Sequence, residues 1–337
     1  MVRVSVIICT YNRCDLLNTT LETVAACSLP NSEWEVLVVD NNSTDQTREI
    51  VGGFSRRFPG RFRYTFEKQQ GLSYARNKGV REARGEIVAF TDDDVLVERS
   101  WLRKLVEPLL VGEWAAVAGR VIPLWRCPRP AWVPTTGPYT RGVLVEFDRG
   151  SISRPLSEPP FGANMAFQRK IFEKYGDFRT DLGRSGTNLL SNEDTEFGHR
   201  LLRGGERFFY EPAAVVYHPV QEERISKRYF QRWWYGKAIA DVKLNGVTES
   251  KFAFFGVPVH LFRRLIACSF RWITCTDPAA RFAWKLNIYG LIGTITESYR
   301  WCHRGHSERA VLGPGMHDDS STESKRSVEP SFGSPSR

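Results

Sequence analysis

The sequence lacks the features that mark several large classes of protein. Its seven cysteines are odd in number and contain no CxxC pair, so we expect neither a disulfide framework nor a zinc site, and a reducing cytosol fits best. No uncharged apolar run reaches the ~18 residues that a membrane-spanning helix needs. The N-terminal apolar run ends at Cys9, which is too short for a signal peptide and is typical of a first strand.

Glycine-rich phosphate loops are missing as well. No GxGxxG follows any predicted strand, which argues against a nicotinamide dehydrogenase. The segment after the first strand, CTYNRCD, contains no glycine. A sugar-nucleotide nucleotidyltransferase would need a glycine-rich phosphate loop at that place, so this class is disfavoured too.

The composition is that of a basic, folded protein. The chain has 337 residues with 42% hydrophobic and 25% charged content, so it can bury a sizeable core. The net charge of +9 favours anionic partners such as nucleotide phosphates, acidic lipid headgroups or nucleic acid. Because no nucleic-acid recognition motif is found, we do not expect nucleic acid among the partners.

Strands and helices alternate through the first 125 residues. Near-continuous apolar runs at 3–10, 34–40 and 86–91 are typical of parallel strands that are buried on both faces. Helical spacing follows the first of these runs and again covers 72–83. This alternation predicts an α/β fold built on a doubly wound, mostly parallel sheet.

The regular alternation of predicted strands and helices ends after this region. A stretch rich in proline and glycine covers about 123–160, where we expect a loop with one short strand near 143–147. A strand and a helix are predicted at 161–176, a further helix at 192–205, and a final strand or strand pair at 206–219.

We expect the chain to divide into three parts. These are an α/β domain over 1–222, a basic, aromatic-rich helical extension over 223–310, and a disordered tail over 311–337. Between residues 251 and 310, nine Lys or Arg stand against three acids. Such helices can lie in an anionic membrane interface, pack on the first domain or form a dimer contact, and the composition leaves all three open.

Polar residues follow three of the predicted strands. They occupy 10–13 with the sequence TYNR, 40–42 with DNN, and 92–94 with DDD. In open α/β sheets, ligands bind beyond the carboxyl ends of the strands. We therefore expect these three clusters to meet in one crevice.

The acidic triplet at 92–94 is the strongest chemical signal. Adjacent carboxylates repel one another unless a cation or hydrogen-bond donors neutralise them, and oxygen ligands select ions such as Mg²⁺ or Mn²⁺. A turn that caps the helix at Ser100 explains the triplet equally well. Asp40 has two readings too, since it can accept from a ribose hydroxyl or base N–H or cap the loop after it. Arg76 suits a diphosphate or base because its guanidinium donates bidentately.

Taken together, six segments resemble the catalytic domain of glycosyltransferase family 2. In chain order they read VSVIICTYNR, VLVVDNNSTDQT, GLSYARNKG, GEIVAFTDDD, FGANMAFQRKIFEKYGDF and NEDTEFGHRL. The resemblance covers about residues 2–220 and implies a GT-A fold. It also implies a metal-dependent inverting enzyme that moves a sugar from a UDP, GDP or dTDP donor to a hydroxyl of a saccharide or lipid-linked acceptor, in cell-surface polysaccharide or glycoconjugate synthesis.

The resemblance further implies roles for individual residues. Asp94, with Asp92 and His218, would hold Mn²⁺ or Mg²⁺, although a lone histidine after a strand is more often structural. Asp194 would be the general base, with Glu193 beside it orienting the acceptor or Asp194 itself. The side chains expected to contact the donor are Thr10, Tyr11, Asn12, Arg13, Asp40, Arg76, Asp92, Asp93 and Asn164.

Several alternatives stay open at this point. Glu193 and Asp194 point about 100° apart on a helix, so only one should face the substrate, and the pair could simply complement the helix dipole. The fold could also serve a non-catalytic nucleotide-sugar or carbohydrate-binding module. Asp94 and Asp194 argue against such a module, because binding alone requires no acceptor-side base. The expected location is cytoplasmic, with peripheral attachment to the inner face of the membrane.

Overall fold

The computed structural model describes residues 2–30, 33–134, 139–186, 188–248 and 250–303. The chain forms two compact units. The first comprises 1–126, 145–187 and 193–220, and the second comprises 127–144, 188–192 and 221–337. The domain boundary predicted from the sequence, at residue 222, assigns 127–144 and 188–192 to the first domain. In the structure these two segments belong to the second unit. The tail predicted to be disordered, 311–337, lies outside the described residues.

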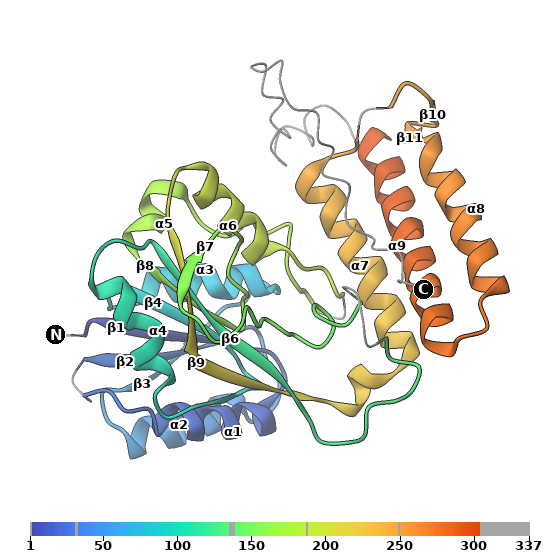
Figure 1. The fold of residues 1–337 in the computed structure, drawn as a ribbon. Coiled ribbons are helices and arrows are strands. Elements are labelled where there is room, and N and C mark those ends of the chain that lie inside the picture. Colours follow the sequence, from blue (N-terminus) through green and yellow to red (C-terminus); the bar gives the residue numbers. More distant parts are fainter. Residues whose placement is uncertain (1, 31–32, 135–138, 187, 249, 304–337) are drawn as a thin grey trace. The chain divides into compact units, whose positions relative to one another are not determined.

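The first unit is built on one mixed sheet whose strands run in the order β3-β2-β1-β4-β8-β6-β9-β5, with β7 paired to β9. The strand bounds are β1 Val4–Thr10, β2 Trp34–Asp40, β3 Phe62–Phe66, β4 Ile87–Asp92, β5 Leu96–Val97, β6 Ala116–Trp125, β7 Arg154–Leu156, β8 Asn164–Gln168 and β9 Phe208–Val220. The helices are α1 Cys14–Ala25, α2 Thr47–Arg57, α3 Leu72–Glu82, α4 Trp101–Leu110, α5 Lys170–Tyr175 and α6 Glu193–Arg203. Figure 1 shows α1 and α2 on one side of the sheet and α5 and α6 on the other.

The four strands β1 to β4 form the parallel half of the sheet. Their apolar side chains are almost completely buried, which explains why their sequence is continuously hydrophobic rather than alternating. The register pairs Thr10 with Asp40 and Cys9 with Asp92. The polar residues at the ends of β1, β2 and β4 are therefore neighbours at one edge, as their positions in the sequence predict.

The other half of the sheet contains antiparallel pairs. β8 runs antiparallel to both β4 and β6, whereas β6 and β9 are parallel. The α/β prediction is confirmed, with a mixed sheet that is parallel over the strands most clearly marked in the sequence. The strand predicted near 143–147 is wrong, because this segment forms turns and only Phe147 makes a bridge, with Val121. The loop also begins later than the predicted residue 123, because β6 continues to Trp125.

The second unit consists mainly of three helices, α7 Lys227–Asn245, α8 Val259–Thr274 and α9 Pro278–His303. A 3₁₀ turn, Glu222–Ile225, precedes α7, and a hairpin of β10 Ala253–Phe254 and β11 Val257–Pro258 leads into α8. Helix α9 packs against both α7 and α8, as Figure 1 shows. The helices predicted in this part of the chain are present. No helix in the described parts of the chain is both long and apolar enough to cross a membrane.

A glycine allows α7 and α9 to approach closely. A Cβ atom at Gly293 would lie 2.5 Å from the Tyr235 carbonyl oxygen of α7 and 3.1 Å from the Ala238 side chain. Because 2.5 Å is shorter than any ordinary carbon–oxygen contact, a larger residue at 293 would push the helices apart. Gly293 therefore fixes the packing distance of this helix pair.

Candidate active site

The loops after β1 and β2 hold each other in place. The Asn12 side-chain oxygen accepts a hydrogen bond from the Thr44 N–H (2.7 Å), and the Asn12 N–H donates to the Ser43 hydroxyl (2.9 Å). Asn12 has φ +50°, a left-handed conformation that asparagine tolerates better than most residues. Beside it, Thr10 is buried and Tyr11 is 39% exposed. Asn12 thus shapes this rim of the sheet by local contacts.

Asp40 is buried at the end of β2, where both of its oxygens accept hydrogen bonds. One accepts from the Ser43 N–H (2.8 Å) and the other from the Tyr64 hydroxyl (2.8 Å). Burial and the hydrogen bond to Asp40 raise the pKa of Tyr64 to about 12, so this hydroxyl stays protonated at neutral pH. The loop-capping reading of Asp40 is therefore realised, and a carboxylate retains capacity for a further donor such as a ribose hydroxyl.

The acidic triplet and His218 meet at one place. Asp92, Asp94 and His218 each offer one possible ligand atom, and these atoms lie within 4.8 Å of one another. The His218 Nε2 atom lies 3.2 Å from an Asp94 carboxylate oxygen, and both side chains are 1% exposed. Strand β5, only two residues long, pairs Leu96 with Tyr217. This pairing brings His218, the next residue of β9, to the turn that carries Asp94.

Arg13 partly neutralises the triplet. Its guanidinium Nη1 lies 3.1 Å from both the Asp93 and the Asp94 carboxylates. Burial raises the pKa of Asp93 to about 6 even though Arg13 opposes this shift. One guanidinium therefore leaves the three carboxylates with excess negative charge. Asp93 faces Arg13 and is not part of the three-residue ligand group with Asp92, Asp94 and His218.

The donor atoms fit a divalent cation. Two carboxylates and an imidazole within reach of one another are a common ligand set for such ions. The imidazole favours a transition ion such as Mn²⁺ over Mg²⁺, because Mg²⁺ prefers oxygen ligands. A cation here would also offset the negative charge that Arg13 leaves uncompensated. Asp92, Asp94 and His218 are therefore the residues that would hold the metal.

A second group of charged residues lies at the N-terminus of α6. The Arg76 guanidinium on α3 forms a 2.6 Å ion pair with the Glu193 carboxylate, and both side chains are almost completely buried. Burial and the neighbouring Asp194 raise the pKa of Glu193, while Arg76 lowers it. The sequence-based expectation placed Arg76 on the donor. The structure instead directs its guanidinium to Glu193.

Asp194 differs from Glu193 in its surroundings. Its carboxylate accepts from the Gly162 N–H (2.8 Å) and from the Thr195 N–H (2.6 Å), and the residue is partly exposed. A Cβ atom at Gly162 would lie 2.5 Å from Arg76 and 2.9 Å from the Asp194 carboxylate. Only glycine at 162 leaves space for both groups. Of the two adjacent acids, Asp194 is the one that solvent or a substrate can reach.

The triplet and the α6 acids share the same electrostatic environment. Burial lowers the pKa of Arg76, but the charges of Glu193, Asp194 and Asp92 together outweigh this effect and raise it. Arg76, Asp92, Asp93 and Glu193 also act on Cys9, although burial is the largest effect and raises the pKa of that thiol to about 12. Asp92 of the metal-ligand group and Asp194 at the start of α6 therefore both act on the buried Arg76.

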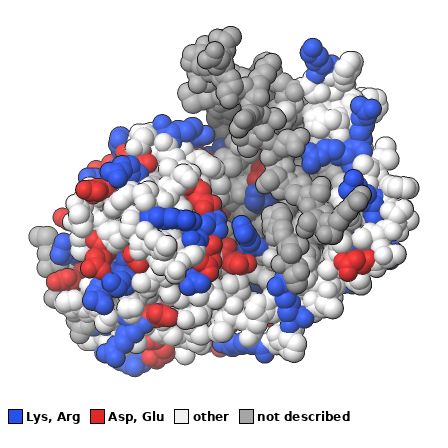
Figure 2. All heavy atoms as spheres, in the orientation of Figure 1, with Lys and Arg blue, Asp and Glu red and all other residues white. Residues whose placement is uncertain are grey.

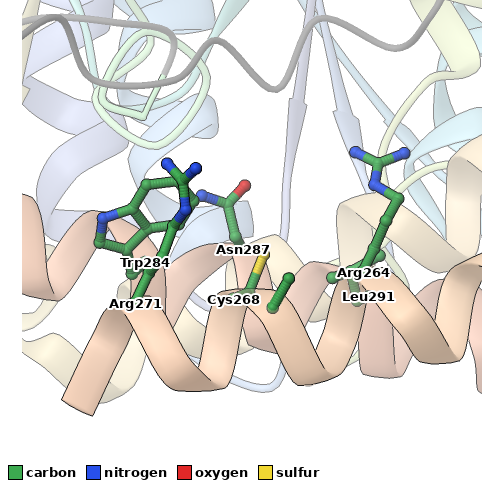
Figure 3. Close-up of a pocket in the computed structure, with 7 residues that line it drawn as sticks. Arg264, Cys268, Arg271, Trp284, Asn287 and Leu291 are labelled. Carbon is green, nitrogen blue, oxygen red and sulfur yellow. The ribbon is translucent and has the colours of Figure 1, made fainter. Parts of the chain in front are cut away.

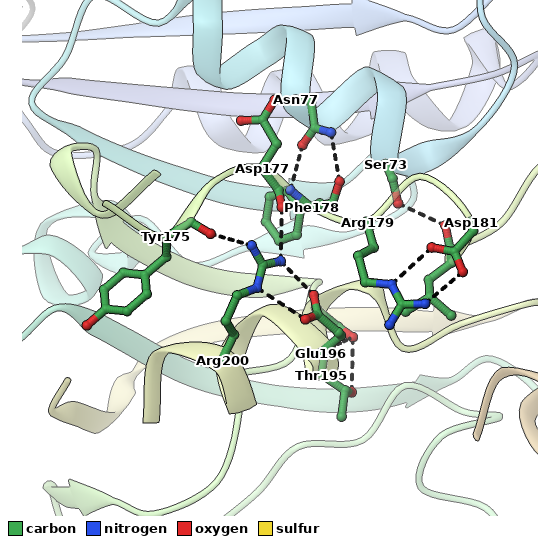
Figure 4. Close-up of polar contacts among 12 residues, drawn as sticks. Ser73, Asn77, Tyr175, Asp177, Phe178, Arg179, Asp181, Thr195, Glu196 and Arg200 are labelled. Atoms are coloured by element: carbon green, nitrogen blue, oxygen red, sulfur yellow. Dashed lines mark hydrogen bonds and ion pairs between the residues drawn. The ribbon is translucent and has the colours of Figure 1, made fainter. Parts of the chain in front are cut away.

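The position of α6 is set by polar contacts to the segment before it (Figure 4). Arg200 on α6 forms an ion pair with Glu196 (2.6 Å) and donates to the backbone oxygens of Tyr175 and Asp177. On the other side of this segment, the Asn77 side chain of α3 both donates to the Phe178 carbonyl and accepts from its N–H, each at 2.9 Å. Helices α3 and α6, which carry Arg76 and Glu193, are thus tied to one connecting segment.

Asn164 requires a correction. It was expected to contact the donor, but its side chain is fully buried at the start of β8. The amide donates to the carbonyl oxygens of Arg120 (2.9 Å) and Ala214 (2.8 Å) and accepts from the Trp101 indole N–H (2.8 Å). Asn164 therefore joins β6, β8, β9 and α4 inside the sheet. Sequence alone could not separate a polar residue at the rim from one just beneath it.

Replacing Asn164 by alanine should destabilise the protein. The change leaves the Trp101 N–H and two carbonyl groups buried without their partner, at roughly 1–3 kcal/mol for each group. We expect the free energy of unfolding to fall by about 3 kcal/mol, measured by chemical denaturation. Asn18→Ala, on the exposed side of α1, is the control and should change stability by less than about 0.5 kcal/mol. Unchanged stability of Asn164→Ala, with weaker donor binding, would restore the original expectation.

Some residues of the site were missed by the sequence analysis. Gly162 carries no chemical group and is identified only by the lack of space around it. Cys9 was counted as part of an apolar strand, and its position beside Asp92 follows from strand pairing. Arg200 had no signal beyond its spacing of four residues from Glu196, which is common on exposed helix faces.

Comparison with known proteins agrees with this geometry. The model of the family described as "Glycosyl transferase family 2" matches residues 5–176, just over half of the chain. A glucosyl-dolichyl phosphate glucuronosyltransferase from Haloferax volcanii is 28% identical over 264 residues, which cover 75% of this chain and 82% of its own. The succinoglycan biosynthesis protein ExoM from Rhizobium meliloti is 28% identical over 251 residues, covering 72% and 77%.

A solved structure shares the fold. The mannosyltransferase PcManGT from Pyrobaculum calidifontis, in complex with GDP-Man and Mn²⁺, has a TM-score of 0.54 and 22% sequence identity, over 92% of this chain and 78% of its own. At this identity the likeness establishes the GT-A fold alone. Together with the family match, it shows that the chain belongs to glycosyl transferase family 2 and is a glycosyltransferase.

Proposed function

We propose that this enzyme transfers a sugar from a nucleotide-diphosphate donor to an acceptor hydroxyl, with inversion at the anomeric carbon. The observation that carries the proposal is the arrangement of two acidic groups about the buried Arg76. One is the metal-ligand group of Asp92, Asp94 and His218, whose Asp92 acts on Arg76, and the other contains the partly exposed Asp194, which acts on Arg76 as well. An inverting displacement requires a leaving diphosphate and a base on opposite sides of the reacting carbon.

The donor side is assigned to the rim formed by β1, β2 and β4. Here Asp40 offers a buried carboxylate for a ribose hydroxyl or base N–H, and Tyr11 is exposed beside it. A divalent cation held by Asp92, Asp94 and His218 would supply neutralising charge for the departing diphosphate. Arg13 contributes a further positive charge at the same place through its contacts to Asp93 and Asp94.

The acceptor side is assigned to Asp194. Its carboxylate is held by the Gly162 and Thr195 N–H groups, which fix its orientation without filling every acceptor position. We propose that it takes the proton from the acceptor hydroxyl during attack. Glu193, which is bound to Arg76, acts as a positioning residue that fixes Arg76 and the start of α6.

The class of acceptor is proposed from the relatives. One is named for transfer to a glucosyl-dolichyl phosphate and another for succinoglycan biosynthesis. We therefore propose a saccharide or lipid-linked saccharide acceptor and a role in cell-surface polysaccharide or glycoconjugate synthesis. No disulfide joins the cysteines of the described residues, which supports a reducing, cytoplasmic location.

A donor screen tests this function. The purified enzyme would be heated with UDP-, GDP- and dTDP-sugars, each with and without Mn²⁺, and the unfolding temperature recorded. We expect one donor to raise it only when the metal is present, since ligands that bind the native state stabilise it. That donor should then be hydrolysed slowly or transferred to acceptor saccharides. Stabilisation that is equal with and without metal, or a product that retains the anomeric configuration of the donor, would contradict the proposal.

A further inference from the structure

Helix α8 carries an apolar stripe that the described residues leave exposed. Ile266, Phe270 and Ile273 are 71%, 67% and 67% exposed. Their spacing of four and three residues places them on one side of the helix. The opposite side of α8 packs through Leu261 against Val257 and Leu291. The helix is therefore apolar on two sides, and only one of them is covered by the described residues.

The hairpin before α8 extends this stripe. Phe252, Phe254 and Phe255 are 75%, 62% and 66% exposed. The ring centroids of Phe254 and Phe255 are 4.6 Å apart, and those of Phe254 and Phe262 are 6.5 Å apart. Phe262 precedes Ile266 by about one helical turn. Phe255 has φ +49°, a strained conformation for an aromatic residue. Such strain persists where an unusual side-chain direction serves a function, and here it holds aromatic rings out at the turn.

Positive charge surrounds the apolar stripe. Residues 251–285 contain six Lys or Arg and one acid, Asp277. Figure 2 shows a mainly uncharged and basic surface over the helices of this unit on the face in view. Arg263 lies within the stripe by helical spacing, one turn before Ile266. A phosphate group near the stripe would therefore find several cationic partners.

Two arginines border a hollow between α8 and α9. The hollow has a volume of about 210 Å³ and is lined by Arg264, Ala267, Cys268, Arg271, Trp284, Asn287 and Leu291. Figure 3 shows the Arg264 and Arg271 guanidinium groups projecting to the same side of the helix. The Arg271 guanidinium lies 4.9 Å from the centre of the Trp284 ring. The hollow is thus cationic, with an aromatic wall, and lies on the helix that carries the exposed stripe.

We propose that α8 and the preceding hairpin dock into the headgroup region of an anionic lipid bilayer. Helices that bind such an interface carry aromatic and aliphatic side chains beside Lys and Arg. The apolar side chains insert into the bilayer surface, and the cations contact the lipid phosphates. A second copy of the chain fits less well, because a symmetric contact would bring the same basic residues together. The lipid phosphates instead complement the charge, and the hollow lined by Arg264 and Arg271 offers them a cationic site.

Flotation of the full chain with vesicles tests this surface. We expect binding to vesicles of phosphatidylcholine mixed with phosphatidylglycerol, weak binding to phosphatidylcholine alone, and release by salt. A variant with Phe270→Glu and Ile273→Glu should lower the partition coefficient by at least about tenfold. Arg263→Gln and Arg271→Gln should each lower it about fivefold.

The control variant carries the same charge change elsewhere. Val111→Glu with Ile152→Glu alters two side chains that are 73% and 74% exposed in the first unit, and its vesicle binding should stay close to that of the unaltered protein. Circular dichroism and light scattering would accompany each variant. The proposal is overturned if the unaltered protein does not float, or if the Phe270 and Ile273 variant floats equally well. It is also overturned if that variant loses only self-association while vesicle binding persists.

Discussion

The Asp194→Asn variant is expected to bind the donor as tightly as the unaltered enzyme and to turn it over about 10²- to 10⁴-fold more slowly. The amide preserves the shape and keeps one oxygen for the Thr195 N–H, while its NH₂ group replaces the oxygen that accepts from the Gly162 N–H. It cannot accept the proton of the acceptor hydroxyl. The loss should fall on kcat.

Glu193→Gln is the matched control for this prediction, since it removes the adjacent charge on the same helix. Glu193 forms a buried ion pair with Arg76, and breaking such a pair costs roughly 3–5 kcal/mol. We therefore expect this variant to be less stable in denaturation experiments while losing less turnover than Asp194→Asn. If Glu193→Gln were stable and lost turnover while Asp194→Asn kept it, the two roles assigned here would be exchanged.

The second large effect is expected from Asp94→Asn, which should abolish metal-dependent donor binding. Asp94 contacts both His218 and Arg13, and its charge is needed to hold a divalent cation with Asp92 and His218. Isothermal titration of the donor in the presence of Mn²⁺ should give no measurable heat of binding. The same result is expected when the unaltered enzyme is titrated in a chelator.

Glu98→Gln is the control for charge removal near this turn. Glu98 accepts a hydrogen bond from the Tyr217 hydroxyl at 2.8 Å, and the glutamine oxygen can accept the same bond. Donor binding should therefore be retained. Tight, Mn²⁺-dependent binding by Asp94→Asn would show that the cation is held elsewhere.

The parallel half of the fold could be predicted because burial on both faces leaves a continuous apolar signal. β1, β2 and β4 are of this kind, and their carboxyl ends mark the rim of the site. The antiparallel placement of β8 and the parallel pairing of β6 with β9 leave no such signal, because a short apolar strand reads the same in either direction. β5 has only two residues, yet it brings His218 to Asp94.

The acids of the candidate site are easier to place from the sequence than its other groups. Three adjacent carboxylates are unusual and their placement follows from the strand before them. Arg76 and Asn164 were assigned to the donor, but their partners are Glu193 and the sheet interior. Whether a polar side chain turns outward or inward depends on residues more than 40 positions away in the chain, which no local pattern contains. Gly162, defined by the space it leaves, is the extreme case.

The most direct test of the whole arrangement is an anomalous difference map from crystals grown with Mn²⁺ and the cognate nucleoside diphosphate. The account predicts one manganese peak in contact with Asp92, Asp94 and His218, the diphosphate bound to the same ion, and the Asp194 carboxylate facing the open side of the diphosphate. A manganese peak at other residues, or an Asp194 side chain directed away from the nucleotide, would contradict it.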